Sequence, residues 1–344
     1  MTGDKTEFEK VTNFGNLYKA YKKSQKGNGS SKSKLKFEAA ALDGIHQIKR
    51  LLETGKYSVD PYSEFKVYEP KERTIKAGSF KDKIVQHSLC DNVLLPLLGK
   101  EFIQTNYAGQ IGKGTLYGLD CLKVQMYLAY QKYGYDCWIV KGDISKFFYS
   151  INHNILKDMV EYFVSDEDVY WICEKFIDST DGLGLPLGNQ VSQVFALLYL
   201  SCFDHFVTGE LGVKYYGRYM DDFYLIVESK DYAKDCLENI KSFIGILNLE
   251  LNGKTQIIPF KNGIKFCGFH TYVTKDGKVI RKLTNEKKRA AKKKYRKMAK
   301  LVRENKLSKE KFIRSYESWK NHVSHGNCVK FTYKMDKMVS EIIT

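Results

Sequence analysis

The middle of the chain reads Lys214-Tyr215-Tyr216-Gly217-Arg218-Tyr219-Met220-Asp221-Asp222-Phe223-Tyr224-Leu225-Ile226-Val227. The aromatic and aliphatic residues on either side of the two aspartates predict two strands joined as a hairpin. Because a strand interior accommodates charge poorly, carboxylates at the tip of such a hairpin either face water or hold a positive group. The second alternative predicts a metal site.

A third acid stands at the end of another apolar segment, Trp138-Ile139-Val140-Lys141-Gly142-Asp143. An aspartate in that position, taken alone, is more often a turn or cap residue. Together with Asp221 and Asp222 it predicts a three-carboxylate site, because acids at the ends of neighbouring strands can converge. Mg²⁺ prefers hard oxygen ligands of this kind. Two such ions about 4 Å apart can bind the attacking hydroxyl, the transferring phosphoryl group and the leaving oxygen together.

The composition suits a globular protein, with 344 residues, 43% hydrophobic and 28% charged. This length allows two or three subdomains around a large core. No apolar run is expected to be long enough to cross a membrane, so no membrane association is predicted. The eight cysteines form no C-x-x-C pair, which favours reduced thiols and a cytoplasmic location over zinc or disulfides.

The net charge of +16 is concentrated at the end of the chain. Residues 281–344 contain 20 Lys and Arg against 6 Asp and Glu, and the rest of the chain contains 36 against 34. Apolar residues at helical spacing predict that this basic segment folds. A folded basic element on a nearly neutral body favours binding to a nucleic-acid backbone over a merely solvated surface.

The segments outside these motifs are expected to be mostly helical. Residues 1–70 predict helices interrupted by a Lys-, Gly- and Ser-rich loop over 22–36. A helix is expected over 80–98, another begins after Asn152, and a third follows a glycine-rich loop at 182–188. After the acidic hairpin we expect a helix over 232–247 and short strands at 255–259 and 265–273.

At these residues the chain resembles a known family. Tyr219-Met220-Asp221-Asp222 in a hairpin, preceded by Asp143 on an apolar strand, resembles the palm of a reverse transcriptase. Residues 65–83, with Arg73, and the run Asp82-Lys83-Ile84-Val85-Gln86 that overlaps their end are similar to the fingers segment of prokaryotic members, and Gly112-Lys113-Gly114-Thr115 extends the match. The resemblance covers almost the whole chain, and its motifs occur in the family's order.

The resemblance implies an α/β right-hand polymerase with fingers at 1–135, an antiparallel-sheet palm at 136–278 and a short basic helical thumb at 279–344. Residues 150–185 would contribute partly to the fingers. It also implies a cofactor, two Mg²⁺ ions per active site, for which Mn²⁺ could substitute. The implied catalytic residues are Asp143, Asp221 and Asp222, and the implied metal-binding residues are these three together with Ile144.

The resemblance further implies contacts with the substrates. Lys71 and Arg73 would hold the triphosphate, Phe148 would exclude a ribose 2′-hydroxyl, and Lys254 would protonate pyrophosphate. Other residues implied to bind the nucleotide are Leu187, Gly188 and Gln190. Those implied to contact template or primer are Ser192, Gln193, Tyr219, Met220, Phe266 and Gly268. Each of these residues taken alone is more often ordinary packing or surface charge.

The segment Gly184-Leu185-Pro186-Leu187-Gly188-Asn189-Gln190-Val191-Ser192-Gln193 narrows the resemblance. Intron-encoded and retron enzymes usually carry Gln where this chain has Leu187, and Ser-Pro where it has Ser192-Gln193. Both departures resemble the reverse transcriptases of diversity-generating retroelements. Trp319-Lys320-Asn321-His322 and His325-Gly326-Asn327 are similar to that branch too. An aliphatic Leu187 offers no polar contact to the nucleotide and so predicts weak discrimination, in line with the adenine-directed errors that the branch implies.

The predicted function is therefore RNA-directed DNA synthesis from a template-repeat RNA, error-prone at template adenines, for mutagenic retrohoming. Its implied partners are template RNA, primer or cDNA, dNTPs and a small accessory variability protein that forms a basic oligomer. A retron, abortive-infection or group II intron-derived enzyme is the nearest alternative. An RNA-binding module with a degenerate polymerase fold and an RNA-dependent RNA polymerase are more distant alternatives; the intact acids argue against the first and Phe148 against the second.

Overall fold

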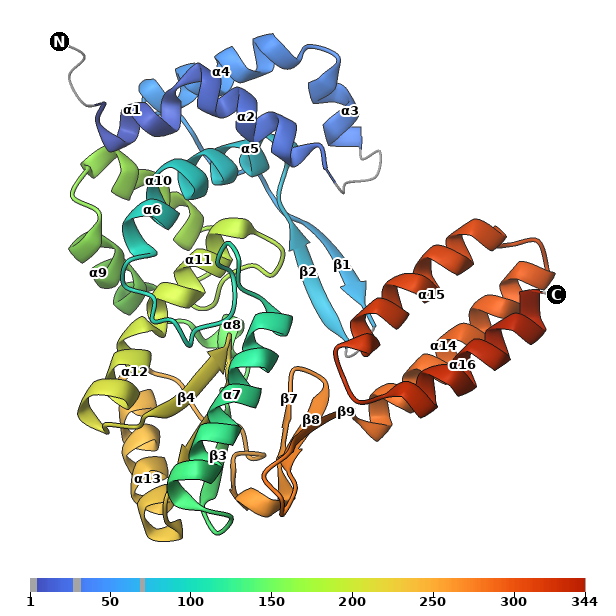
Figure 1. Ribbon diagram of the computed structural model, residues 1–344. Helices are drawn as coiled ribbons and strands as arrows, with labels where there is room; N and C mark the ends of the chain where they lie inside the picture. The colour runs from blue at the N-terminus through green and yellow to red at the C-terminus, as the bar shows by residue number, and fades with distance from the viewer. Residues whose placement is uncertain (1–4, 27–31, 69–71, 344) are drawn as a thin grey trace. The chain divides into compact units, whose positions relative to one another are not determined.

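The structure is a computed structural model that describes residues 5–26, 32–68 and 72–343, and it divides into two compact units. The first unit contains the described residues as far as Ile111, together with Ile144–Glu210 and Asn239–Asn252. The second contains Gly112–Asp143, Leu211–Glu238 and the described residues from Gly253 onward. Figure 1 shows the elements of each unit and labels most of them.

The first unit is mainly helical. Its helices are α1 (Glu7–Thr12), α2 (Phe14–Ser24), α3 (Lys32–Glu38), α4 (Ala41–Glu53), α5 (Phe80–Leu89), η1 (Cys90–Leu94), α6 (Leu95–Leu98), α8 (Phe147–Ser150), α9 (His153–Phe163), α10 (Glu167–Ile177), α11 (Gln190–Tyr199), α12 (Ser201–His205) and η2 (Phe206–Glu210). Side chains that accept backbone hydrogen bonds start several of them, as Asn152 does for α9, which confirms the predicted cap. Of the loop expected over 22–36, residues 22–24 belong to α2 and residues 32–36 to α3, and residues 27–31 lie outside the described residues.

The first unit also contains an antiparallel hairpin of β1 (Ser63–Val67) and β2 (Arg73–Ala77). The glycine-rich loop before α11 lies against β2, since the Lys76 N–H donates to the Leu187 carbonyl at 3.1 Å. The expected helix over 80–98 is present as α5, η1 and α6 in succession.

The second unit is built on a four-stranded antiparallel sheet with the order β4-β5-β3-β6. Its strands are β3 (Trp138–Asp143), β4 (Tyr215–Tyr219), β5 (Asp222–Val227) and β6 (Gln256–Pro259). Phe223 to Val227 are all buried, which explains the continuous apolar run of β5. Helix α7 (Thr115–Tyr133) packs against this sheet, and its Gln125 side chain donates to the Tyr216 carbonyl at 3.0 Å. Helix α13 (Lys230–Ile246), of which the residues up to Glu238 belong to this unit, follows β5 and confirms the helix expected there.

The remainder of the second unit is a small sheet followed by three helices. The sheet is β7 (Ile264–Phe266), β8 (Phe269–Val273) and β9 (Val279–Leu283), and a short 3₁₀ turn, η3 (Phe260–Asn262), precedes it. The helices are α14 (Asn285–Arg303), α15 (Lys309–Ser324) and α16 (Val329–Ile343). They enclose a core of Tyr295, Ala299, Phe312, Tyr316, Met335 and Val339, so the basic segment folds as its apolar spacing predicts.

One helical run, Gln190–Glu210, has the length and composition of a membrane span among the described residues. The expectation that no apolar run reaches that length is therefore wrong. Within the first unit 72% of this window is buried. The run is apolar because it forms part of the unit's core.

Candidate active site

The pairing of β3 with β5 brings two of the three predicted acids together. Asp143 ends β3 and Asp222 begins β5, and the two residues are direct partners across the antiparallel pair. Met220 and Asp221 form the two-residue connection between Tyr219 and Asp222. Like charges placed opposite each other destabilise a sheet unless a cation lies beside them. The register therefore favours a positively charged group at this end of the sheet.

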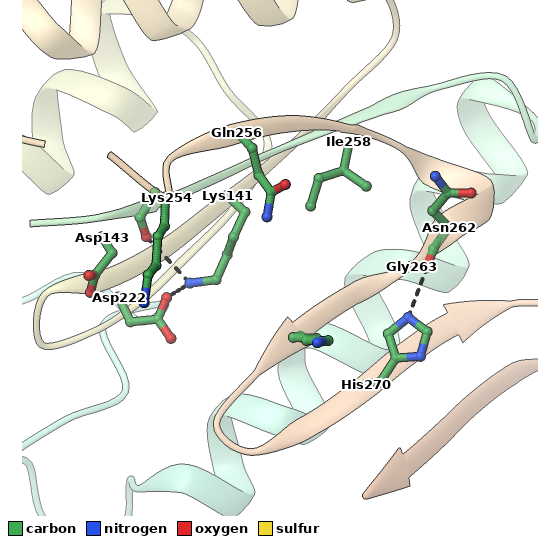
Figure 2. A pocket seen from close by; sticks show the side chains of 11 residues that line it. Lys141, Asp143, Asp222, Lys254, Gln256, Ile258, Asn262, Gly263 and His270 are labelled. Atoms are coloured by element: carbon green, nitrogen blue, oxygen red, sulfur yellow. Dashed lines mark hydrogen bonds and ion pairs between the residues drawn. The ribbon is translucent and has the colours of Figure 1, made fainter. Parts of the chain in front are cut away.

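Lys141 supplies positive charge in the structure as it stands. Its ammonium contacts Oδ1 of Asp222, as Figure 2 shows. Burial lowers the pKa of Lys141 to about 8, and the negative charges of Asp143 and Asp221 oppose that shift. The same ammonium lies 5.6 Å from the centre of the Phe266 ring. All three predicted acids therefore act on one lysine, which the analysis of the sequence did not assign to the site.

A cavity of about 390 Å³ opens beside this lysine. Its lining residues are Lys141, Gly142, Asp143, Asp222, Lys254, Gln256, Ile258, Asn262, Gly263, Lys265 and His270. Two predicted acids and the predicted Lys254 thus share one cavity, whereas Asp221 does not line it (Figure 2). Nε2 of His270, one of these lining residues, lies 2.8 Å from the Asn262 carbonyl. The combination of carboxylates and lysines can bind both cations and phosphate oxygens.

The acids match Mg²⁺ in donor chemistry, because carboxylate oxygens from facing strand ends border the same space. As the side chains stand, the described residues contain no group of three Asp, Glu, His or Cys side chains arranged to hold a metal ion. Asp222 faces Lys141 instead. An ion that binds here must therefore replace the lysine as the partner of Asp222.

The hairpin turn is held by a second residue that the sequence analysis missed. Arg218 is completely buried, and its Nη1 donates to the Met220 carbonyl at 2.9 Å. Met220 has φ of 55°, a left-handed conformation that is uncommon for a residue other than glycine. The guanidinium thus stabilises the turn that carries Asp221. A charged residue inside an otherwise apolar strand was the signal available in the sequence.

The predicted turn at Phe266-Cys267-Gly268-Phe269 is present. Phe266 and Phe269 are paired across β7 and β8, and Cys267 and Gly268 between them have φ of 46° and 84°. A two-residue connection with both φ values positive is typical of a tight hairpin. Phe266 is buried with its ring 5.1 Å from that of Tyr224. Its side chain is therefore part of the core, and the turn itself is what faces outward.

The first unit gathers several of the residues predicted to bind the nucleotide. The Leu185 N–H donates to the Phe148 carbonyl at 2.6 Å. This bond connects the glycine-rich loop to the residue that is predicted to exclude a ribose 2′-hydroxyl. At Gly188, where φ is 119°, a β-carbon would lie 3.2 Å from Ile75 of β2. Leu187 and Gly188 therefore lie against β2, whose first residue is the exposed Arg73, and Phe148 contacts the same loop at Leu185. Lys71 lies outside the described residues.

The remaining predicted residues of α11 differ in exposure. Gln190 is engaged within the unit, because its side chain donates to Asp91 at 3.0 Å. Ser192 is buried, so its side chain offers no surface to a template in this arrangement, whereas Gln193 is exposed. Ile144 is also buried and forms an isolated bridge with Leu251.

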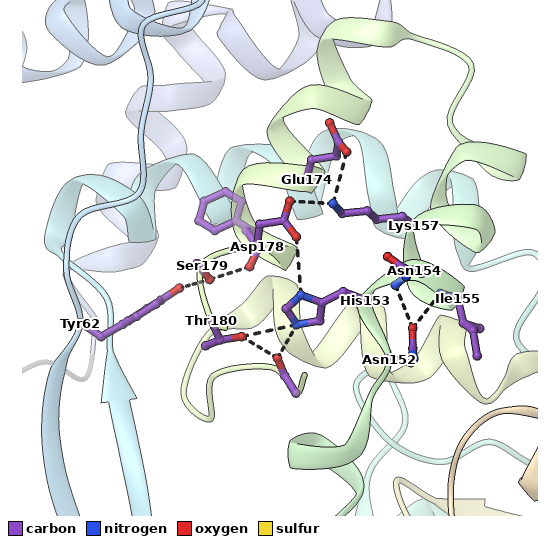
Figure 3. A network of polar contacts seen from close by, with 12 residues as sticks. Tyr62, Asn152, His153, Asn154, Ile155, Lys157, Glu174, Asp178, Ser179 and Thr180 are labelled. Carbon is purple, nitrogen blue, oxygen red and sulfur yellow. Dashed lines mark hydrogen bonds and ion pairs between the residues drawn. The ribbon is translucent and has the colours of Figure 1, made fainter. Parts of the chain in front are cut away.

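A polar network fixes the start of the glycine-rich loop, as Figure 3 shows. His153 Nε2 and Thr180 Oγ1 both lie within hydrogen-bond distance of the Gly184 carbonyl, at 2.9 and 2.6 Å. Asp178 lies 3.5 Å from His153 Nδ1 and 2.7 Å from Lys157. These contacts hold Gly184 in its left-handed conformation, with φ of 78°. They therefore fix the part of the loop that precedes Leu187, whose carbonyl accepts a hydrogen bond from Lys76 of β2.

An antiparallel sheet with acids at facing strand ends and in the connecting hairpin defines the palm of an α/β polymerase. Comparison with known proteins gives the same class. The family described as reverse transcriptase (RNA-dependent DNA polymerase) matches residues 71–271. Because this match covers more than half of the chain, the chain belongs to the reverse transcriptase family.

Individual relatives are distant. The chain is 24% identical over 255 residues to protein YkfC of Escherichia coli K12, across 60% of this chain and 66% of the relative. It is 24% identical over 328 residues to the COX1/OXI3 intron 2 protein of Saccharomyces cerevisiae, across 73% of this chain and 37% of that protein. A telomerase from Candida albicans, solved in complex with a telomeric RNA fragment, is similar in fold, with a TM-score of 0.50 and 14% identity over 68% of this chain and 46% of that one.

Proposed function

We propose that this chain is an RNA-directed DNA polymerase that extends a primer along an RNA template. One observation carries the proposal: Asp143 and Asp222 are paired at facing strand ends, with Asp221 in the connecting turn, inside a chain of the reverse transcriptase family. The primer 3′-hydroxyl attacks the α-phosphate of a dNTP, a new phosphodiester bond forms, and pyrophosphate leaves. Such reactions depend mainly on positioning and on stabilisation of negative charge.

Asp143, Ile144, Asp221 and Asp222 would hold two Mg²⁺ ions, for which Mn²⁺ could substitute. When bound, such ions neutralise charge on the reacting phosphate oxygens and orient the attacking and leaving groups. Proton transfer to the leaving group would depend on the chain's own residues. Lys254, which shares the cavity with Asp143 and Asp222, is suited to protonate the leaving pyrophosphate.

The proposed fingers, palm and thumb are residues 1–135, 136–278 and 279–344. Arg73 on β2 would bind the triphosphate, and Phe148 would collide with a ribose 2′-hydroxyl and so select dNTPs. The support for these roles is that the loop containing Leu187 and Gly188 contacts both β2 and Phe148. Tyr219, Met220 and the turn at Gly268 are proposed to contact the primer or template.

The test of this function is primer extension on an RNA template by the Asp221→Asn variant. Asparagine keeps the shape of the side chain and removes its charge, so we expect dNTP incorporation to be lost while nucleic-acid binding is largely retained. Asp231→Asn is the matched control, because Asp231 is exposed on α13 and pairs with the neighbouring Lys234. Continued polymerisation by Asp221→Asn would refute the assignment of the metal site.

We further propose that the enzyme is of the diversity-generating retroelement type, making error-prone cDNA from a template-repeat RNA for mutagenic retrohoming. The support is the pair of departures at Leu187 and Ser192-Gln193. The Leu187 carbonyl is anchored to β2 and its side chain is half-buried, so it can present an apolar surface and no hydrogen bond. An apolar contact discriminates weakly between nucleotides.

Leu187→Gln tests the low-fidelity proposal by restoring a polar side chain. We expect less misincorporation opposite template adenine, while errors opposite the other template bases change less. Leu183→Gln is the matched control, because Leu183 is an exposed leucine of the same loop. Unchanged errors opposite adenine in Leu187→Gln would count against the proposed role of the leucine, and a retron or group II intron-derived enzyme would then be the better assignment.

The partners of this activity are proposed to be template RNA, primer or cDNA, dNTPs and a basic oligomeric accessory variability protein. The accessory protein is tested by co-purification. A protein encoded beside the same template RNA should be retained when the full chain is purified. The eight cysteines are free thiols. This agrees with the reducing cytoplasm that we propose as the location.

A further inference from the structure

A basic groove lies between α14 and α16 and shares no lining residue with the acidic cavity. Its lining residues are Asn285, Lys288, Arg289, Lys292, Lys330, Phe331 and Lys334, and they enclose about 410 Å³. Five of the seven residues are cationic and none is acidic. The four from α14 follow the spacing i, i+3, i+4 and i+7, so they lie along one face of that helix.

The five cations of this basic groove lack acidic partners among the described residues, whereas some lysines elsewhere in the same unit have them. Lys265 pairs with Glu286, Lys300 with Glu304 and Lys320 with Asp336. Within the described residues, no carboxylate lies within ion-pair distance of the five. Their charge is therefore available to an external anion.

Phe331 provides an aromatic surface within the same groove. The Nζ atoms of Lys288 and Lys292 each lie 5.8 Å from its ring centre. Another side of the ring meets Trp319 of α15, with 6.0 Å between the centres, so the ring is anchored against the core of the helices. Phe331 itself is half-buried. A fixed ring flanked by flexible cations is the combination that binds a base together with its neighbouring phosphates.

We propose that this groove binds a single-stranded segment of RNA, with one base stacked on Phe331 and the flanking phosphates on the five cations. Contacts between exposed ammonium groups and a ring are weak, so the lysines can turn toward phosphates and leave the ring to the base. A paired base cannot offer its face in this way, which favours a single strand.

The choice of RNA over DNA rests on the proposed function. In that reaction the RNA template arrives unpaired, whereas the DNA strand is made already paired with it. The groove would therefore hold template RNA outside the reacting duplex. It is a separate contact from those proposed at the acidic cavity, because it shares no residue with that cavity.

The test is equilibrium binding of a labelled 12-nucleotide RNA, single-stranded or annealed to its DNA complement, by fluorescence anisotropy without dNTP or divalent metal. For Phe331→Leu, we expect affinity for the single strand to fall about 5- to 150-fold, the range for loss of one stacked base, with little change for the duplex. Tyr333→Leu is the matched control, since Tyr333 is an exposed aromatic residue of α16 that does not line the groove.

The charges are tested by the triple variant Lys288→Gln, Lys292→Gln and Lys334→Gln. Each lost phosphate contact on a single strand lowers the slope of log affinity against log salt by about 0.7, so the slope should fall by about 2. The control is Lys293→Gln, Lys297→Gln and Lys311→Gln, which removes the same charge from exposed positions outside the groove. Melting temperatures of all variants verify that the helices remain folded.

Equal losses in the two triple variants would overturn the groove as a site, and unchanged single-strand affinity in Phe331→Leu would overturn the stacking. Tighter binding of single-stranded DNA than of RNA would overturn the assignment to template RNA. Failure of the polymerase proposal is separable, because that proposal is judged by dNTP incorporation and Asp221→Asn, and the binding assay contains no dNTP.

Discussion

Replacing Gly142 by alanine should disturb the strand pair that carries the acids. Gly142 lies directly opposite Phe223 across β3 and β5. A β-carbon on Gly142 would stand 2.0 Å from Cζ of Phe223 and 2.5 Å from Cε1 and Cε2. The Phe223 ring is fully buried, so it cannot move into solvent to make room. The substitution must therefore separate the strands or displace the ring.

The size of the effect follows from two opposing contributions. Overpacking a well-packed core costs about 1–3 kcal/mol, and this contact belongs at the upper end because the overlap involves three ring atoms. Replacing glycine by alanine in a strand returns about 0.5–1 kcal/mol of backbone entropy. The net loss in local stability should thus be about 2 kcal/mol, equivalent to about 30-fold faster opening of the strand pair.

The assay is hydrogen exchange by mass spectrometry on peptides covering 138–143 and 222–227, because exchange reports local opening without requiring the whole chain to unfold in one step. Phe223→Leu in the Gly142→Ala background should relieve much of the overlap, so the two substitutions should be non-additive. Wild-type exchange in Gly142→Ala would refute the reasoning, as would strict additivity in the double variant. The same substitution should lower dNTP incorporation, since Asp143 and Asp222 adjoin the two residues.

Two further substitutions test the cationic neighbours of the acids. Lys141→Met removes the ammonium that an ion must displace from Asp222, so Mn²⁺ measured by electron paramagnetic resonance should bind about tenfold more tightly or better, the equivalent of one charged contact; weaker binding would mean that the lysine instead orders the carboxylates. Arg218→Met removes the hydrogen bond to the Met220 carbonyl and should weaken the turn by about 1.5–3 kcal/mol, seen as about 10- to 150-fold faster amide exchange at 219–222. Unaltered exchange there would show that the turn does not depend on this guanidinium.

The acidic hairpin and the strand before Asp143 could be predicted because their signal is local. Apolar residues surround the acids at strand length, and β3, β4 and β5 have nearly the predicted bounds. The helix α7 was not predicted. Its outward face carries Val124, Tyr127 and Leu128, so the apolar residues do not form one clear stripe. Strand β9 was likewise included in the basic segment, because only its pairing with β8 distinguishes it from the start of a helix.

The roles of Lys141 and Arg218 depend on contacts that no local pattern specifies. Lys141 reaches Asp222 only because β3 and β5 pair in the register that aligns Asp143 with Asp222. A shift of one residue would turn the side chains to opposite faces and remove the contact. Similarly, the burial of Ser192 and the engagement of Gln190 with Asp91 follow from how α11 packs in the first unit. These features required the three-dimensional structure.

The most direct measurement of the central claim is the rate of single-nucleotide addition to a primer on an RNA template, with and without Mg²⁺, for the wild-type chain and Asp143→Asn. If carboxylates from separate strands jointly bind the ions that polymerisation needs, the wild-type chain adds the nucleotide only when the ion is present and the variant adds none. Addition at comparable rates by the variant, or by the wild-type chain in excess chelator, would contradict the account.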